Sequence, residues 1–194
     1  VVSSVFHSDR IYWHENDGSH FQTNAELQTA VDLWVSDNAT ALSTYGEINT
    51  WDVSLITDMS ELFKDKTTFN DDISDWDVSS ATVMDYMFSS AYNFNQDISS
   101  WDVSSVTNMV AMFYRADSFN QAISNWDLSS VTTMGYMFQD ADSFNGDISG
   151  WDVSSVTTMG GMFNDASSFN GDISGWDVSN VTNMTNMFLS ANDL

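Results

Sequence analysis

The sequence predicts an α/β repeat solenoid in which every 25-residue coil contributes one short strand and one short helix. The first observation is a tetrapeptide, WDVS or WDLS, that starts at Trp51 and returns every 25 residues up to Trp176. A fixed period between about 20 and 50 residues is typical of solenoids and propellers. The second observation is a helical spacing of apolar residues in one half of each copy. The third is a strand-like pattern in the other half.

The repeat unit reads W-D-V-S-S-V-T-x-M-x-x-M-F-x-x-A-x-x-F-N-x-D-I-S-x, with five full copies over residues 51–175 and a sixth that runs from Trp176 to Leu194. All 11 Met fall in two columns of this alignment, 11 of the 13 Phe fall in two more, and six of the eight Trp open the copies. Columns of this kind predict a core in which like residues stack from coil to coil, about 5 Å apart if the coils pair as strands.

The helical half is represented by Met109, Met112, Phe113 and Ala116, which recur at i, i+3, i+4 and i+7 and predict a short helix. Thr107 precedes this face by two residues, where an N-cap hydroxyl is expected. The other half, residues 98–106, reads I-x-x-W-x-V-x-x-V, the leucine-rich-repeat template with Val in place of its Asn. This pattern directs the Trp and Val side chains of the strand inward and the Ser and Asp side chains outward. The Asn of each Phe-Asn pair is expected to satisfy backbone groups of a turn, with ligand contact as the alternative.

Three segments are predicted: a strand, hairpin or linker over 1–23, a helical N-terminal cap over 24–50, and the solenoid over 51–194. The cap prediction rests on the capping-box pattern Thr23-Asn24-Ala25-Glu26 and on an apolar stripe that starts at Leu27. The phrase VVSSVF is strand-like without a partner in the repeat scheme, and Asp17-Gly18 suits a hairpin turn. No C-terminal cap is visible, so we expect either that the array continues in a longer chain or that something else covers that end.

The composition excludes several classes of function. With 28 acidic and 4 basic residues the formal net charge is −24, which disfavours nucleic-acid binding and electrostatic docking to anionic lipid. The absence of Cys excludes disulfides and thiolate chemistry, and no apolar run is long enough to insert into a membrane. Because the chain begins at Val1 without a signal-peptide pattern, we expect a processed product or an excised piece. Asn38, Asn180 and Asn183 match the N-glycosylation pattern, which matters only in a eukaryotic secretory setting.

The phrase FNQDISSWDVSSVTNM at 94–109 closely resembles the repeat of a bacterial surface-protein family, a domain of unknown function first noted in Mycoplasma lipoproteins. That family is related to BspA-like leucine-rich-repeat surface proteins, and similar arrays occur in marine microbes and algae. The resemblance covers Thr23 to Leu194 and includes ELQTAVDLWVSD in the cap. It implies an extracellular or cell-surface solenoid that serves adhesion or recognition and brings no catalytic residues. Ala122 replaces an Asp of the family phrase and Gly replaces Gln or Ser in the last copies, so ladders on those columns are imperfect.

Two acidic columns are the candidate ligand or cation sites. The outward column that follows each Trp consists of Asp52, Asp77, Asp102, Asp127, Asp152 and Asp177, and the second consists of Glu47, Asp72, Asp97, Asp147 and Asp172. Stacked carboxylates repel one another and need hydrogen bonds, raised pKa values or bound cations. Two interpretations are open: the carboxylates cap local turns, or they bind Ca²⁺, which prefers clustered oxygen ligands.

A second metal candidate is the group His14, Glu15, Asp17 and His20, although loop histidines are more often solvated. An enzyme is not expected, because catalysis needs one singular site and a regular array makes every coil alike; a carboxylate-based glycosidase is the remaining enzymatic option. An ice-binding protein would use the regular Thr and Ser columns. The expected partner is a cell-surface protein or a glycan. The main alternative is binding to copies of the chain itself in a head-to-tail extracellular filament.

Overall fold

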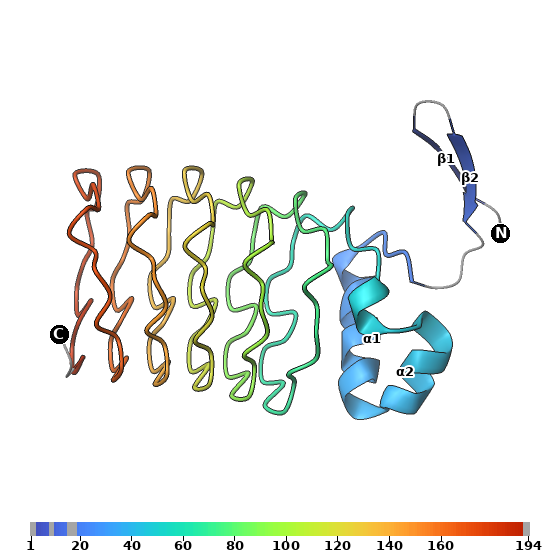
Figure 1. Cartoon of the computed structure of the whole chain (residues 1–194), viewed down its shortest axis with the longest axis horizontal. Coiled ribbons are helices and arrows are strands. Elements are labelled where there is room, and N and C mark those ends of the chain that lie inside the picture. The colour runs from blue at the N-terminus through green and yellow to red at the C-terminus, as the bar shows by residue number, and fades with distance from the viewer. Residues whose placement is uncertain (1–2, 8–9, 15–18, 192–194) are drawn as a thin grey trace.

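The computed structural model describes residues 3–7, 10–14 and 19–191, and Figure 1 shows a stack of similar coils with two helices at one end. The elements are β1 (Ser3–His7), β2 (Arg10–His14), α1 (Asn24–Ser36), α2 (Asn38–Tyr45) and the 3-10 turn η1 (Ile48–Thr50). β1 pairs antiparallel with β2, with Ser3 opposite His14. The described part of the strand-like VVSSVF segment, from Ser3 on, therefore has a partner in the next strand of the chain. The hairpin turn predicted at Asp17-Gly18 lies outside the described residues.

The predicted α/β solenoid of leucine-rich-repeat type is wrong. Residues 51–191, all of which the structure describes, contain no α-helix and no strand. Neighbouring coils are joined instead by single parallel bridges, which run from Asp58–Val83 through to Thr158–Asn183. Each coil consists of turns and extended single residues, and the stack is held together between coils rather than by secondary structure within them.

The routing of backbone hydrogen bonds explains why the apolar helical spacing does not form a helix. In the third coil the N–H groups of Met109 and Ala111 donate to the carbonyls of Thr133 and Gly135 in the next coil, at 3.0 and 2.9 Å. The N–H of Met112 closes a turn on the Met109 carbonyl three residues earlier, at 3.3 Å. An α-helix would send all of these donors to the carbonyl four residues back. Successive turns thus bring the Met, Phe and Ala side chains to one side as a helix would.

Left-handed residues fix these turns. Eleven non-glycine residues have φ between 53° and 61°, and they fall in two columns, one that starts at Glu61 and one that starts at Asp65. Ala111, with φ of 53°, occupies the third position of the turn that starts at Met109, where a type II turn requires positive φ. A left-handed conformation costs a non-glycine residue about 1–2 kcal/mol, so inter-coil bonding and packing must offset this cost in every coil.

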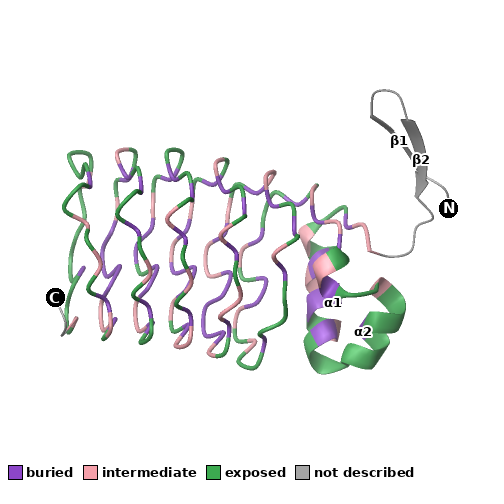
Figure 2. Ribbon diagram, in the orientation of Figure 1, coloured by how far each residue is buried: buried purple, intermediate pink, exposed green. Residues whose placement is uncertain are grey.

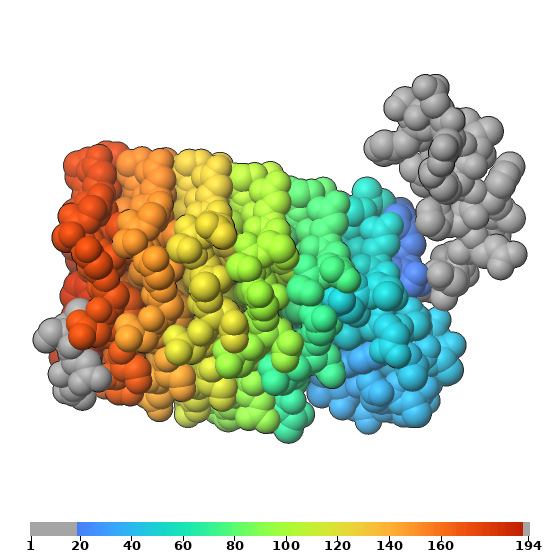
Figure 3. Space-filling model, viewed as in Figure 1, coloured from blue at the N-terminus to red at the C-terminus, as the bar shows by residue number. Residues whose placement is uncertain are grey.

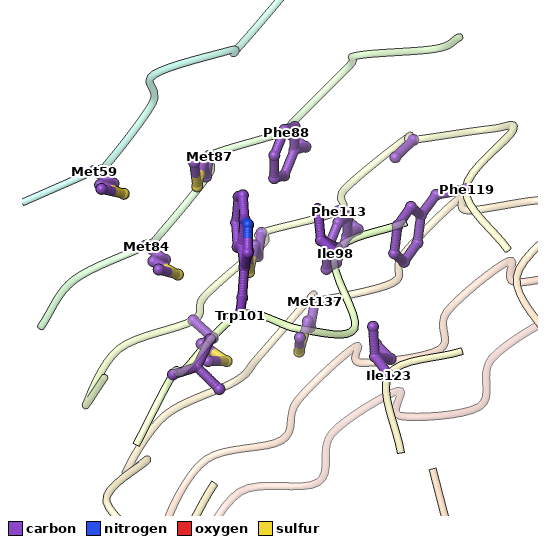
Figure 4. Close-up of a cluster of buried hydrophobic side chains, with 14 of the residues drawn as sticks. Met59, Met84, Met87, Phe88, Ile98, Trp101, Phe113, Phe119, Ile123 and Met137 are labelled. Carbon is purple, nitrogen blue, oxygen red and sulfur yellow. The ribbon is translucent and has the colours of Figure 1, made fainter. Parts of the chain in front are cut away.

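The core is a set of continuous side-chain columns, and this part of the prediction is confirmed. Phe63, Phe88 and Phe113 stack at centroid distances of 5.3 and 5.6 Å, and the spacing in this column continues at 5.5 to 5.8 Å to Phe188. Within a coil, Phe113 lies 4.0 Å from Phe119 of the second Phe column. Figure 4 shows these rings with the Met columns beside them, and Figure 2 shows that the buried residues recur in every coil.

Polar ladders join the coils at three further columns. The indole of Trp101 donates to the carbonyl of Ile73, 28 residues earlier, at 3.2 Å, and the later Trp residues repeat this bond. The side-chain oxygen of each of the first four Asn in the Phe-Asn pairs accepts from the backbone N–H of the next Asn, at 2.8 to 2.9 Å, which confirms that this column satisfies backbone groups. The predicted Thr N-cap is wrong, because no helix follows. The Thr107 hydroxyl instead donates to the Thr82 carbonyl at 3.2 Å.

The N-terminal end of the stack is covered by α1. The predicted capping box is present between Thr23 and Glu26, and the predicted stripe of Leu27, Ala30, Val31 and Trp34 is buried. Asn24 and Gln28, one helical turn apart, donate side-chain N–H groups to the carbonyls of Asp58 and Leu62 at 2.7 and 3.0 Å. In later coils the same carbonyl columns accept N–H groups from the preceding coil. The helix therefore takes the place of a preceding coil.

The last described coil has no such cover. Val178, Met184 and Phe188 are 38%, 41% and 37% exposed, whereas the residues in the same columns of the preceding coils are at most 1% exposed. The apolar columns therefore reach the surface at this end of the stack.

Candidate functional site

The first acidic column caps local turns. The Oδ1 atom of Asp102 accepts from the Ser104 backbone N–H at 3.0 Å and from the Ser104 hydroxyl at 2.6 Å. The backbone part of this arrangement, from the Ser two residues on, recurs at every Asp of the column: Asp52, Asp77, Asp127, Asp152 and Asp177. The identical residue in every copy thus has a structural reason that involves no ligand.

The Asp residues of the second column make the same bond. Asp72, Asp97, Asp147 and Asp172 accept from the N–H of Ser74, Ser99, Ser149 and Ser174 at 2.9 to 3.0 Å. Glu47 is the exception, because its side chain caps no backbone group.

The pKa values follow from these bonds. Hydrogen bonds from Ser104 hold the pKa of Asp102 below its ordinary value, and bonds from Ser129 do the same for Asp127. The neighbours Asp152 and Asp102 raise the pKa of Asp127 only as smaller contributions. Repulsion between stacked carboxylates can be relieved by hydrogen bonds, raised pKa values or bound cations, and in these columns hydrogen bonds stabilise the ionised form.

Asp52 differs from the rest of its column because it also contacts His20. The Nδ1 atom of His20 lies 2.6 Å from Oδ2 of Asp52, and His20 forms a parallel bridge with the same residue. Partial burial raises the pKa of Asp52, but bonds from Ser54 and His20 outweigh that effect and lower it overall. This pair was not predicted, since His20 lies 32 residues from Asp52.

No three acidic or histidine side chains converge into a metal-binding group among the described residues. Three of the four members of the predicted histidine–carboxylate group lie outside that set: Glu15 and Asp17, which are not described, and His14, whose side chain is not described. Where side chains are described, no helix is long and apolar enough to cross a membrane.

A different surface varies from coil to coil. The outward positions of segments 60–67, 85–92, 110–117, 135–142 and 160–167, which we call the variable edge, change in size, charge and aromatic character, while the buried Phe between them is constant. At one column the residues are Glu61, Tyr86, Ala111, Tyr136 and Gly161. Glu61 and Tyr136 are exposed and Tyr86 is half-buried, whereas Ala111 and Gly161 are buried. Figure 3 shows successive coils as adjacent bands, so a column of equivalent residues runs along the stack. The sequence contained this signal, as variation among otherwise matching copies.

The variable edge contains aromatic and charged groups in contact. Lys64 Nζ lies 5.2 Å from the ring centroid of Tyr86, and the Arg115 guanidinium lies 5.6 Å from that of Tyr92, both within cation–π range. Tyr136 is 50% exposed. Partial burial, and then the charges of Asp142 and Asp140, raise the pKa of Asp117 on this edge.

Comparison with protein families identifies a match to "Mycoplasma protein of unknown function, DUF285", over residues 34–145 and 121–194. The chain belongs to this family. The match includes the last residues of α1, all of α2 and every coil, while most of α1 lies before its start. Neither the curated proteins nor the solved structures contain a match to the chain.

Proposed function

We propose that this DUF285 chain is a non-catalytic recognition module of an extracellular or cell-surface adhesin, and that the variable edge is its ligand-binding surface. One observation carries the proposal: the repeat is nearly invariant at its core and capping columns, and it varies along the variable edge, where exposed residues such as Glu61 and Tyr136 are interspersed with buried small ones. Repeat proteins commonly use one face of a regular stack as an extended binding surface. The expected partner remains a cell-surface protein or a glycan.

The proposal moves the candidate site away from the acidic columns. Each Asp of these columns accepts the hydrogen bond of a local turn, so its recurrence is explained without a ligand. The finer family relationship, to the BspA-like leucine-rich-repeat surface proteins, also remains a proposal and supports the surface location by analogy alone. The head-to-tail filament is less favoured, because α1 covers the end of the stack that a second copy would have to contact.

Binding of the full chain to a glycan array, followed by titration of the strongest glycan, tests the proposal. Tyr86→Asn and Tyr136→Asn introduce the residue that stands in this column at Asn186, so the left-handed backbone is preserved. We expect each variant to weaken binding at least tenfold. The matched control is Asp152→Asn in the first acidic column, which should change affinity less than twofold. Loss of binding in the control alone, with its thermal unfolding unchanged, would return the site to the acidic column. The absence of any glycan ligand would exclude the glycan form of the proposal.

A further inference from the structure

A pocket with a volume of about 380 Å³ lies where the helical cap meets the first coil. We propose that it binds a small organic cation, namely an amine or ammonium group attached to a compact hydrocarbon body. Its lining includes Val35 and Leu42 from the cap helices, Glu47 from the connection, and Phe69 and Asp71 from the first coil. The volume lies within the range of small-molecule sites, about 300–1,000 Å³. The inference is independent of ligand binding at the variable edge.

The pocket exists because the cap replaces a coil. Each later ring of the second Phe column up to Phe144 stacks between two members of that column, but Phe69 has one such neighbour, Phe94 at 5.9 Å, besides Phe63 of its own coil at 4.2 Å. On its other side the cap helices stand where a preceding Phe would lie, and they do not reproduce its shape. The site is therefore singular in an otherwise repetitive molecule, which is the property that the acidic columns lack.

Apolar groups form one part of the wall. Val35 and Leu42 are 37% and 41% exposed, although both are large aliphatic residues next to the core. Trp34 lines the pocket as well, and its indole N–H donates to Asp71 Oδ2 at 2.9 Å. This bond links α1 to the first coil across the site, so the wall is held in place before a ligand arrives. Burying a hydrocarbon body against these side chains supplies a favourable, non-directional contribution.

Charge selects the polar end of the ligand. The lining contains two carboxylates, Glu47 and Asp71, and no lysine, arginine or histidine. Glu47 is the one member of the second acidic column whose carboxylate caps no turn. The whole chain has a net charge of −24, so its field repels anions and attracts cations. An apolar wall with two carboxylates and no basic side chain therefore favours a hydrophobic cation over a neutral or anionic molecule of the same shape.

The test uses the full chain and cyclohexylmethylammonium as the probe, with cyclohexylmethanol as its neutral analogue. Binding is followed by NMR through the indole N–H signal of Trp34, assigned with a Trp34→Phe variant, and by calorimetry. We expect saturable binding of the ammonium and at least fivefold weaker binding of the alcohol. Glu47→Gln should weaken ammonium binding at least fivefold, and Leu42→Ser should weaken both probes.

Asp147→Asn is the matched control, because it removes one charge from the same column four coils away. It should leave the affinity within twofold. Equal losses for Glu47→Gln and Asp147→Asn would mean that the general field, not this site, attracts the probe, and would overturn the proposal. Equal affinities for the ammonium and the alcohol, or no saturable shift of the Trp34 signal, would overturn it as well. None of these results bears on glycan binding at the variable edge.

Discussion

In the column of stacked Phe rings, the same substitution can be compared at a ring buried between two coils and at a partly exposed ring in the last coil. Phe113 is fully buried and stacks on Phe88 and Phe138 at 5.6 and 5.5 Å, and on Phe119 at 4.0 Å. Phe188 in the last coil is 37% exposed and stacks on Phe163 at 5.7 Å. Replacement of a buried Phe by Ala costs about 3–5 kcal/mol, from lost burial and from the cavity left behind.

We therefore expect Phe113→Ala to lower the free energy of unfolding by about 3–5 kcal/mol, and Phe188→Ala by about 1–2 kcal/mol, since its ring is partly solvated already. Urea unfolding followed by circular dichroism measures both. Should Phe113→Ala fail to fold, Phe113→Leu keeps most of the apolar area and loses the ring pairs, each worth about 0.5–1.5 kcal/mol. Equal losses at positions 113 and 188 would refute the conclusion that stacking between coils holds this fold together.

Three further predictions concern the turns and the carboxylates. Asp65→Gly should stabilise the chain by about 1 kcal/mol in thermal unfolding, because Gly removes the cost of φ at 60°, whereas Thr67→Gly, at an exposed residue outside the left-handed columns, should destabilise it. Asp117→Asn should raise the Tm at pH 7, and this gain should disappear as the pH falls through the raised pKa of Asp117. The capping carboxylate of Asp102 acts in the opposite direction: its stabilisation is present above its unfolded pKa and is lost as the pH falls through its lowered folded pKa. A melt with calcium and then with excess chelator, at fixed ionic strength, should show no calcium-specific shift, because the acidic columns already cap turns; a large rise would make them metal sites.

Burial could be predicted from the sequence, and the backbone conformation could not. The columns of Trp, Val, Met and Phe side chains are inside because their period places them in register, whatever the local structure. The spacing of Met109, Met112 and Phe113 is equally compatible with a helix and with successive turns, since both return to the same face after three or four residues. The helix and the successive turns differ in whether alternate backbone N–H groups bond within the coil or to the next coil. The identity of the side chains does not determine this choice.

The left-handed positions could not be predicted from the sequence, for a related reason. Turns with positive φ normally have Gly or Asn at that position, and in the two left-handed columns only Gly161 and Asn186 fit this rule. Tyr86 and Arg115 adopt the same conformation because each turn lies between two others of the same shape. The cap was predictable, since a capping box and an apolar stripe depend on neighbouring residues alone. The contact of His20 with Asp52 depends on how the chain enters the first coil, which no local pattern reports.

Residues recur in this chain where the structure requires them. A residue that recurs in every coil has an assigned structural contact: the Trp indole bonds the Ile carbonyl, the Asp caps its Ser, and the Asn and Thr side chains bond the adjacent coil. Substitution at such a column perturbs the fold first, so a loss of binding there says little about recognition. The exposed positions of the variable edge and the junction where the cap replaces a coil have no such recurring contact. Buried positions of the edge do limit the side chain, because a Cβ atom at Gly161 would lie 2.4 Å from the Tyr136 ring. A ligand can therefore be matched through the exposed members, such as Glu61 and Tyr136, while the left-handed backbone is kept.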